Sequence, residues 1–285
     1  MTVALIYKKS AWELFSESSD KNVSSFISQD NQQREAFKES HTIQKKTIDC
    51  VEKTLTDHNT SIKKIYRSSL SDHDLNNFDL VITVGGDGTF LESTHYVTGN
   101  TPIVGVNSDP SRSVGFFCAC NTENFADFYN KISEQPKISL SRLSLSVNGK
   151  STGPPILNDI LFANPNPAAT TRYKLNDESY RNSGLLASTA AGSTAWTFQE
   201  GVEPLPLGSQ EFQFIHRGTR NSQVSVTSKL EIHSLTRKGT IFIDGDHCSI
   251  PLYIGQKLKI TSGIPIIVIG DINKKRAEFL SQYDL

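Results

Sequence analysis

The chain has 285 residues, of which 36% are hydrophobic, and its formal net charge at pH 7 is −1. This length exceeds a typical single domain, and the apolar content is enough for one large core or two smaller ones. The balanced charge excludes an overall basic surface for nucleic acid, and no apolar run approaches the roughly 20 residues of a membrane span. We therefore expect no nucleic-acid partner and no association with a membrane.

The first apolar run, in MTVALIYKKS, is too short for a signal peptide and predicts a strand. Cys50, Cys118, Cys120 and Cys248 are irregularly spaced, which argues against a disulfide framework, and Cys118-x-Cys120 offers at most two metal ligands. We expect Cys118 and Cys120 to be ordinary thiols of the core. We expect the protein to lie in the cytoplasm or an equivalent reducing compartment.

Strand-like and helix-like segments alternate over the first 130 residues. Short apolar runs predict strands at 3–7, 62–66, 80–84 and 102–106, and helical periodicity predicts helices at 32–58, 90–97 and 122–132. Residues 16–31 are polar and serine-rich, which predicts either a flexible loop over the site or disorder. The alternation predicts an α/β domain with an open, mostly parallel sheet that binds ligands at the carboxyl ends of its strands.

The segment VITVGGDGTFLES, residues 81–93, carries the strongest chemical signal. Three glycines, Gly85, Gly86 and Gly88, allow positive φ and leave no Cβ between the backbone amides and a ligand. With the positive end of the following helix, those amides suit a phosphate. A strand-to-helix turn capped by Asp87 explains the carboxylate but not the glycines. A carboxylate among such amides is costly unless it positions a sugar hydroxyl or a magnesium ion.

Helix signals become rare after Lys137, where short β-like runs are bounded by Gly, Pro and Asn. We expect three parts: an α/β domain at 1–135 with the glycine loop, a β-rich domain at 136–270 that binds the dinucleotide, and a C-terminal helix at 271–285 that packs back on the first domain.

GGDGT followed by a helix resembles the signature of the NAD kinase superfamily, which also contains lipid kinases and phosphofructokinases. Four later segments occur in the order expected of NAD kinases: PIVGVNSDPSRSVGFFC (102–118), LNDILFANPNPAATTRY (157–173), SGLLASTAAGSTAW (183–196) and GTIFIDG (239–245). The resemblance covers roughly residues 78–265. It is closest to the branch that contains plant NADH kinases and animal mitochondrial NAD kinases.

This resemblance implies transfer of the γ-phosphoryl group of ATP, with Mg²⁺, to the 2′-hydroxyl of the adenosine ribose in NAD or NADH. Asp87 is the implied catalytic residue, which orients and finally deprotonates the hydroxyl. No residue is assigned as a metal ligand. The implied contacts to nucleotides are made by Gly85, Gly86, Gly88, Thr89, Asn158, Asp159, Arg181, Ser183, Thr194, Ala195 and Trp196. The resemblance also suggests a homodimer or a higher homo-oligomer.

Within this set, the family pattern assigns Asn158 and Asp159 to ribose hydroxyls and the Thr194–Trp196 run to the adenine pocket. Ser183 stands where most bacterial relatives carry Asp near the nicotinamide ring, which is cationic in NAD and neutral in NADH. Loss of that carboxylate predicts that NADH is accepted at least as well as NAD.

Several alternatives stay open at this level. Local turns could supply the hydrogen-bond partners that the Asn158 and Asp159 side chains need. The block at 188–196 could be a tight strand-to-helix connection, and Arg181 could be an exposed arginine without a ligand role. Residues 111–115 form either an anion site or a surface turn, and Asp244-Gly245 either binds a neighbouring subunit's nucleotide or makes a hairpin turn. A lipid kinase would not need Asn158-Asp159, and a non-catalytic nucleotide sensor would be expected to lack Asp87 or a loop glycine. The seven histidines show no catalytic spacing.

Overall fold

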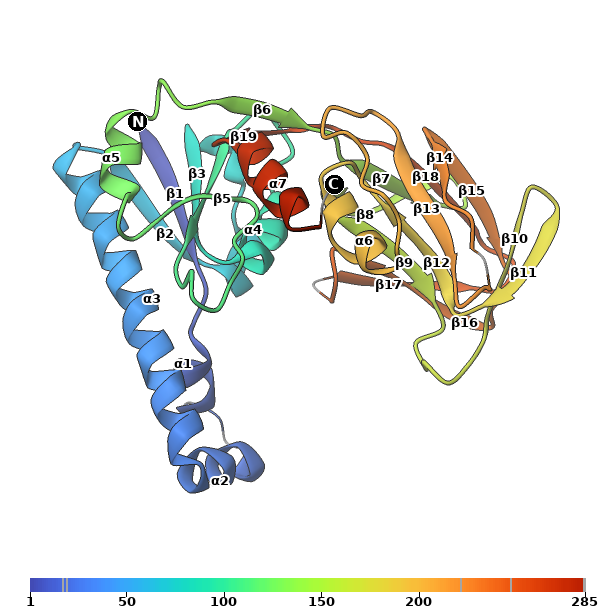
Figure 1. The fold of residues 1–285 in the computed structure, drawn as a ribbon, viewed down its shortest axis with the longest axis horizontal. Helices are drawn as coiled ribbons and strands as arrows, with labels where there is room; N and C mark the ends of the chain where they lie inside the picture. The colour runs from blue at the N-terminus through green and yellow to red at the C-terminus, as the bar shows by residue number, and fades with distance from the viewer. Residues whose placement is uncertain (17, 19, 221, 247, 284–285) are drawn as a thin grey trace. The chain divides into compact units, whose positions relative to one another are not determined.

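The structure, a computed structural model, describes residues 1–283 except residues 17, 19, 221 and 247. The chain forms two compact units (Figure 1). One contains residues 1–93, 100–138 and the segment from 267 onward, and the other contains residues 94–99 and 139–266.

A seven-stranded sheet forms the centre of the first unit. Its order is β2-β1-β3-β4-β19-β6, with β5 beside β4, and the pairs β1–β2, β1–β3, β3–β4, β4–β5 and β4–β19 are parallel. The strands are β1 (Thr2–Tyr7), β2 (Ser61–Tyr66), β3 (Leu80–Gly85), β4 (Ile103–Asn107), β5 (Cys118–Asn121), β6 (Lys137–Leu140) and β19 (Ile266–Ile269). Every residue of β3 and β4 is buried, as expected of central parallel strands. The predicted open, mostly parallel α/β sheet is confirmed.

The helix α3 (Asn31–Asp57) runs along this sheet (Figure 1). It buries Ile48, Val51 and Leu55 in the same core as the strand residues Val3 and Ile82, and it matches the helix predicted at 32–58 within one residue at each end. The other helices are α1 (Ala11–Ser16), α2 (Lys21–Gln29), α4 (Asp87–Thr94), α5 (Phe125–Asn130), α6 (Trp196–Gln199) and α7 (Ile272–Leu280), with short 3-10 turns at Arg67–Asp72, Leu75–Asn77, Gly192–Thr194 and Ser281–Tyr283. None of the described helices has both the length and the apolar character that crossing a membrane requires.

The prediction of a loop or disorder over residues 16–31 is wrong where α2 lies. Asp20 accepts a hydrogen bond from the Asn22 amide at 2.8 Å, and Asp30 accepts one from the Gln33 amide at 2.9 Å, so both α2 and α3 begin at an aspartate cap. The aspartate caps and the helical spacing of Val23 and Phe26 outweigh the polar, serine-rich composition of the segment. Residues 17 and 19 lie outside the described residues.

Two helix boundaries also differ from prediction. α4 begins at Asp87 and ends at Thr94, three residues earlier than expected at each end. Gly88 of the glycine loop therefore already belongs to the helix. α5 starts at Phe125 because Asn121 and Asn124 first make a turn, in which the Asn121 amide donates to Asn124 Oδ1 at 2.8 Å.

Two six-stranded sheets form the second unit, with orders β11-β10-β15-β18-β7-β8 and β14-β13-β12-β9-β16-β17. Residues from both sheets, such as Tyr173, Ile260, Phe162 and Leu185, share one core. The strands are β7 (Leu143–Val147), β8 (Lys150–Ile156), β9 (Asp159–Ala163), β10 (Thr171–Leu175), β11 (Glu178–Asn182), β12 (Gly184–Ser188), β13 (Phe212–Arg217), β14 (Ser225–Thr227), β15 (Lys229–Ser234), β16 (Lys238–Ile243), β17 (Cys248–Tyr253) and β18 (Lys257–Ser262). The predicted β-rich part is therefore present. One predicted β run, residues 265–270, instead supplies β19 to the first sheet, where its apolar sequence suits a parallel strand.

All four cysteines are free thiols. Cys118 and Cys120 are buried, and burial raises the pKa of the Cys120 thiol to about 12 and that of Cys118 well above its ordinary value. These two residues therefore act as small core side chains, as predicted.

Candidate functional site

The glycine loop of the first unit joins β3 to α4 by close packing. A Cβ on Gly85 would overlap the hydroxyl of Thr89, and a Cβ on Gly86 would overlap the hydroxyl of Ser113. Gly85, Gly86 and Gly88 do not use the positive φ that glycine allows, and Gly88 lies inside α4. Glycine is needed here because neighbouring side chains approach the backbone closely, which sequence alone does not reveal.

Asp87 binds the loop that precedes β5. Its Oδ2 accepts a hydrogen bond from the Phe116 amide at 2.9 Å, and its Oδ1 accepts one from the Phe117 amide at 2.8 Å. The side chain of Lys275 holds the same loop by donating to the Gly115 carbonyl at 2.9 Å. A carboxylate oxygen can accept more than one donor, so both oxygens of the half-buried Asp87 keep room for another partner.

Residues 111–115 form an ordered turn whose arginine is already paired. Arg112 Nη1 lies 3.0 Å from Asp109 Oδ2, and its Nη2 lies 2.7 Å from Glu39 Oε2. Gly115 has φ of +60°, and a Cβ there would overlap the Asn107 side chain. The neutralised guanidinium favours the surface turn over the anion site.

In the second unit the structure brings two predicted segments together. The Asn158 carbonyl accepts a hydrogen bond from the Thr189 amide at 3.0 Å, and Thr189 Oγ1 donates to the Leu157 carbonyl at 2.5 Å. Gly192 lies so close that a Cβ would overlap the Asn158 backbone. The Asn158-Asp159 pair and the small-residue block at 188–196 thus lie against each other and make up one candidate site.

Asp244 organises this site, and sequence reasoning missed its role. Asp244 and Gly245 have φ of +50° and +86° between β16 and β17, so the hairpin-turn alternative is correct for the backbone. The buried Asp244 side chain, however, turns inward. It accepts hydrogen bonds from the amides of Leu157 (3.3 Å), Asn158 (2.7 Å) and Asp159 (3.1 Å). An Asp-Gly pair signals the turn but not where its side chain points.

Asp159 is a second buried carboxyl group beside Asp244. Burial, and next the negative charge of Asp244, raise the pKa of Asp159 to about 7, although the Gly245 amide opposes the shift by donating to it. Asn158 Nδ2 also donates to Asp159 Oδ2 at 3.0 Å. The Asp159 carboxyl is therefore expected to exchange its proton near neutral pH.

Trp196 lies at the start of α6, directly after Thr194 and Ala195. The guanidinium of Arg217 lies 4.7 Å from the centre of its ring, and Arg217 Nε also bonds Glu200 Oε1 at 2.7 Å. One face of the indole is thus covered by a cation.

Arg181 and Ser183 lie apart from these segments in the topology. Arg181 is exposed on the edge strand β11, opposite Arg172, and so belongs to a different six-stranded sheet from Asp159 on β9. Ser183 connects β11 to β12, and its hydroxyl packs against Gly218.

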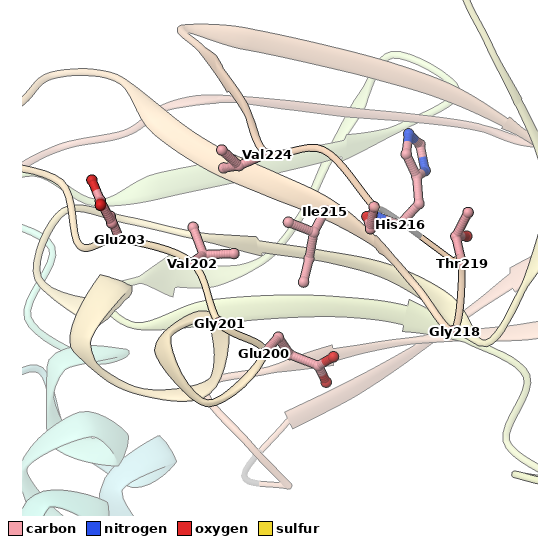
Figure 2. Close-up of a pocket in the computed structure, with 10 residues that line it drawn as sticks. Glu200, Gly201, Val202, Glu203, Ile215, His216, Gly218, Thr219 and Val224 are labelled. Atoms are coloured by element: carbon pink, nitrogen blue, oxygen red, sulfur yellow. The ribbon is translucent and has the colours of Figure 1, made fainter.

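Gly218 also lines a pocket of about 390 Å³ that the sequence did not suggest. Figure 2 shows Val202, Ile215 and Val224 gathered at its centre, with Glu203 on one side and Thr219 on the other. None of the predicted contact residues is among the described residues that line it. Within the described part of the chain, no three His, Cys, Asp or Glu side chains are grouped to hold a metal ion.

Comparison with known proteins shows which family this geometry belongs to. The "Probable NADH kinase" of rice, Oryza sativa, is 30% identical over 267 residues, covering 80% of this chain and 81% of that protein. The chain belongs to the NAD kinase family. The NADH kinase of Arabidopsis thaliana is 32% identical over 265 residues, covering 79% and 82%.

Other comparisons agree with membership of the NAD kinase family. The family model described as the ATP-NAD kinase N-terminal domain matches residues 7–137, which include the glycine loop. The crystal structure of an NAD kinase from Archaeoglobus fulgidus in complex with ATP superposes with a TM-score of 0.69 at 20% identity, covering 98% of this chain and 97% of that one. At this identity the superposition shows a shared fold.

The raised pKa of Asp159 predicts a pH-dependent difference in stability between the wild type and Asp159→Asn. The folded state keeps the carboxyl protonated up to about pH 7, whereas the unfolded chain ionises near pH 4, so wild-type stability falls as pH rises between these values. The asparagine variant does not titrate there. Relative to wild type it should therefore gain stability from pH 5 to pH 8, by a few kcal/mol at most.

Urea unfolding of both proteins at the two pH values measures this gain. Asp177→Asn, at an exposed aspartate in the β10–β11 turn, is the matched control and should track the wild type. An equal difference between Asp159→Asn and wild type at pH 5 and pH 8 would contradict the shifted pKa.

Proposed function

We propose that the protein transfers the γ-phosphoryl group of ATP to the 2′-hydroxyl of the adenosine ribose of NAD or NADH. The observation that carries this proposal is the similarity to the plant NADH kinases, which extends over about 80% of both chains and therefore over both units. Phosphoryl transfer depends mainly on positioning and on neutralising charge, because its transition state is loose.

Asp87 is the proposed catalytic residue. The two amides of residues 116 and 117 hold its carboxylate in one orientation, and this leaves lone pairs that can accept the 2′-hydroxyl proton. A fixed acceptor aligns the attacking oxygen at little entropic cost.

The phosphates of ATP are proposed to bind at Gly85, Gly86, Gly88 and Thr89. The first amides of a helix lack intrahelical partners and carry the positive end of its dipole, and α4 begins within this loop. Thr89 Oγ1 is buried and finds no hydrogen-bond partner in the described part of the chain, which suits a donor reserved for a ligand. Mg²⁺ typically uses one or two carboxylates together with phosphate oxygens, so we propose that it binds as part of the MgATP complex.

The dinucleotide is proposed to bind at Asn158 and Asp159, with Thr194, Ala195 and Trp196 beside the adenine. Two hydrogen bonds support this assignment, because the amide and the hydroxyl of Thr189 donate to the carbonyls of Asn158 and Leu157 and so join the two segments. The roles of Arg181 and Ser183 stay predictions. Stacking of adenine on Trp196 would use the face opposite Arg217 or require that Arg217 move.

Two alternatives are less well supported. The plant relatives are NADH kinases, which argues against a lipid kinase, and the presence of Asp87 with all three loop glycines argues against a non-catalytic sensor. We further propose a reducing compartment such as the cytoplasm, with which the four free thiols agree. The homodimer or higher oligomer suggested by the resemblance stays a prediction, and light scattering coupled to gel filtration would test it.

One assay tests the central proposal. Purified protein is incubated with ATP, Mg²⁺ and either NAD or NADH, and the formation of NADP or NADPH is measured. We expect product with at least one dinucleotide. Absence of product with both would overturn the proposal, whereas product formed only when polyphosphate replaces ATP would change the donor alone.

Asp87→Asn should lower kcat by roughly 100-fold or more, because the side chain keeps its shape but loses its proton-accepting charge. The amide NH₂ group would also face one of the two backbone donors, so the variant should lose some stability. Turnover is therefore measured well below the melting temperature, with Asp127→Asn on the exposed side of α5 as control. Wild-type turnover in folded Asp87→Asn would exclude Asp87 from the mechanism.

Ser183→Asp should shift preference toward NAD. A carboxylate about 6 Å from the cationic nicotinamide ring would favour the oxidised form by up to roughly 3 kcal/mol at an effective dielectric constant near 20. The measured quantity is the ratio of kcat/KM for NADH to that for NAD, which we expect to be at least one in the wild type and lower in the variant. A wild-type ratio far below one that the substitution does not move would rule out this role for Ser183.

A further inference from the structure

A buried hydrogen bond joins His95 to Asp244, the residue that holds the backbone of the proposed dinucleotide site. His95 Nε2 lies 2.8 Å from Asp244 Oδ2, and the side chains are 5% and 0% exposed. Both residues belong to the second unit. His95 lies outside the glycine-loop segment and outside the four family motifs named from the sequence.

The contacts of Asp244 decide which partner donates. Asp244 Oδ1 accepts from the amides of Asn158 and Asp159, and Oδ2 accepts from the amide of Leu157 and bonds His95. Backbone amides only donate, so the carboxylate acts as an acceptor at both oxygens, and His95 contributes Nε2–H. Such a bond to an ionised group is stronger than a neutral one and fixes the direction of the carboxylate.

The backbone beside His95 is itself held in place. The buried guanidinium of Arg142 donates to the Thr94 carbonyl at 2.7 Å and to the Ile264 carbonyl at 2.7 Å. Thr94 is the last residue of α4, so the imidazole extends from a fixed helix end. A side chain held in this way can orient its partner.

Asp244 acts where the sheet ladder is interrupted. Leu157 and Asn158 lie between β8 and β9, where the chain passes from one six-stranded sheet to the other, and Asp244 binds their amides. Rotation of this carboxylate would release the backbone from which the Asn158 and Asp159 side chains project.

We propose that His95 is a positioning residue for the dinucleotide: by holding the Asp244 carboxylate, it fixes the Leu157–Asp159 backbone and thereby the side chains that contact the ribose. The inference rests on the proposed function for the identity of the ligand. Because the His95 side chain is almost fully buried and bonded to Asp244, it acts through that residue and not on the substrate.

Two substitutions of His95 by amide side chains test this role, because the side chains differ in whether they are long enough to reach Asp244. In His95→Gln the side-chain nitrogen lies three bonds from Cβ, as Nε2 does in histidine, whereas in His95→Asn it lies only two bonds away. Both are neutral and polar, so they differ mainly in whether they reach Asp244. His41→Asn is the control: in the first unit His41 bonds Ser10 through Nδ1, which lies two bonds from Cβ, so asparagine keeps a polar atom at that position.

We expect His95→Asn to raise KM for NAD(H) by about tenfold, the effect of losing one hydrogen bond to a charged group. KM for ATP should change less than about twofold, and His95→Gln should stay close to wild type for both substrates. Equal KM values for NAD(H) in the wild type and both variants would overturn the proposal. So would a parallel rise in both KM values, which indicates general loss of structure.

Hydrogen exchange gives a readout that does not need activity. The amides of Leu157, Asn158 and Asp159 should exchange faster in His95→Asn than in the wild type or in His95→Gln. Failure of the wild type to phosphorylate NAD(H) would refute the proposed function while this exchange result still tests the positioning role. Unchanged exchange in folded His95→Asn would refute the positioning role by itself.

Discussion

A carboxylate with no exposed surface, that of Asp244, holds the candidate dinucleotide site of the second unit together. Burying such a charge costs several kcal/mol unless donors surround it. Here three backbone amides and the imidazole of His95 supply them. These amides cluster where the chain passes from β8 in one sheet to β9 in the other. The side chain thus replaces the strand pairing that is interrupted there, and the site depends on it.

The first unit uses the same device at the glycine loop. Asp87 accepts hydrogen bonds from the amides of Phe116 and Phe117. The residue that we propose takes a proton from the substrate therefore also fixes the loop before β5. Its chemical and structural roles are therefore linked. Backbone donors from another segment thus stabilise the negative charge that Asp87 carries within the glycine loop.

Predictions from sequence succeeded where the determining contacts are local or periodic. The buried strands β1, β3 and β4 are continuous apolar runs, and α3 repeats its apolar face over many turns. They failed where side-chain caps or packing decide. α2 forms between two aspartate caps in a segment whose polar, serine-rich composition predicted a loop. Gly85 and Gly86 lie close to the side chains of Thr89 and Ser113 and do not have positive φ.

The sequence by itself determined the fold class, the position of the glycine loop and the family motifs, because apolar periodicity and motif spacing are properties of the linear chain. Only the tertiary structure decided which donors surround Asp87, and that Asp244 turns inward to bind residues 157–159 and His95. Asp244 and Asn158 are 86 residues apart in sequence. The direction of a side chain at a hairpin turn depends on what packs beneath it, and nothing in the local sequence encodes that neighbour.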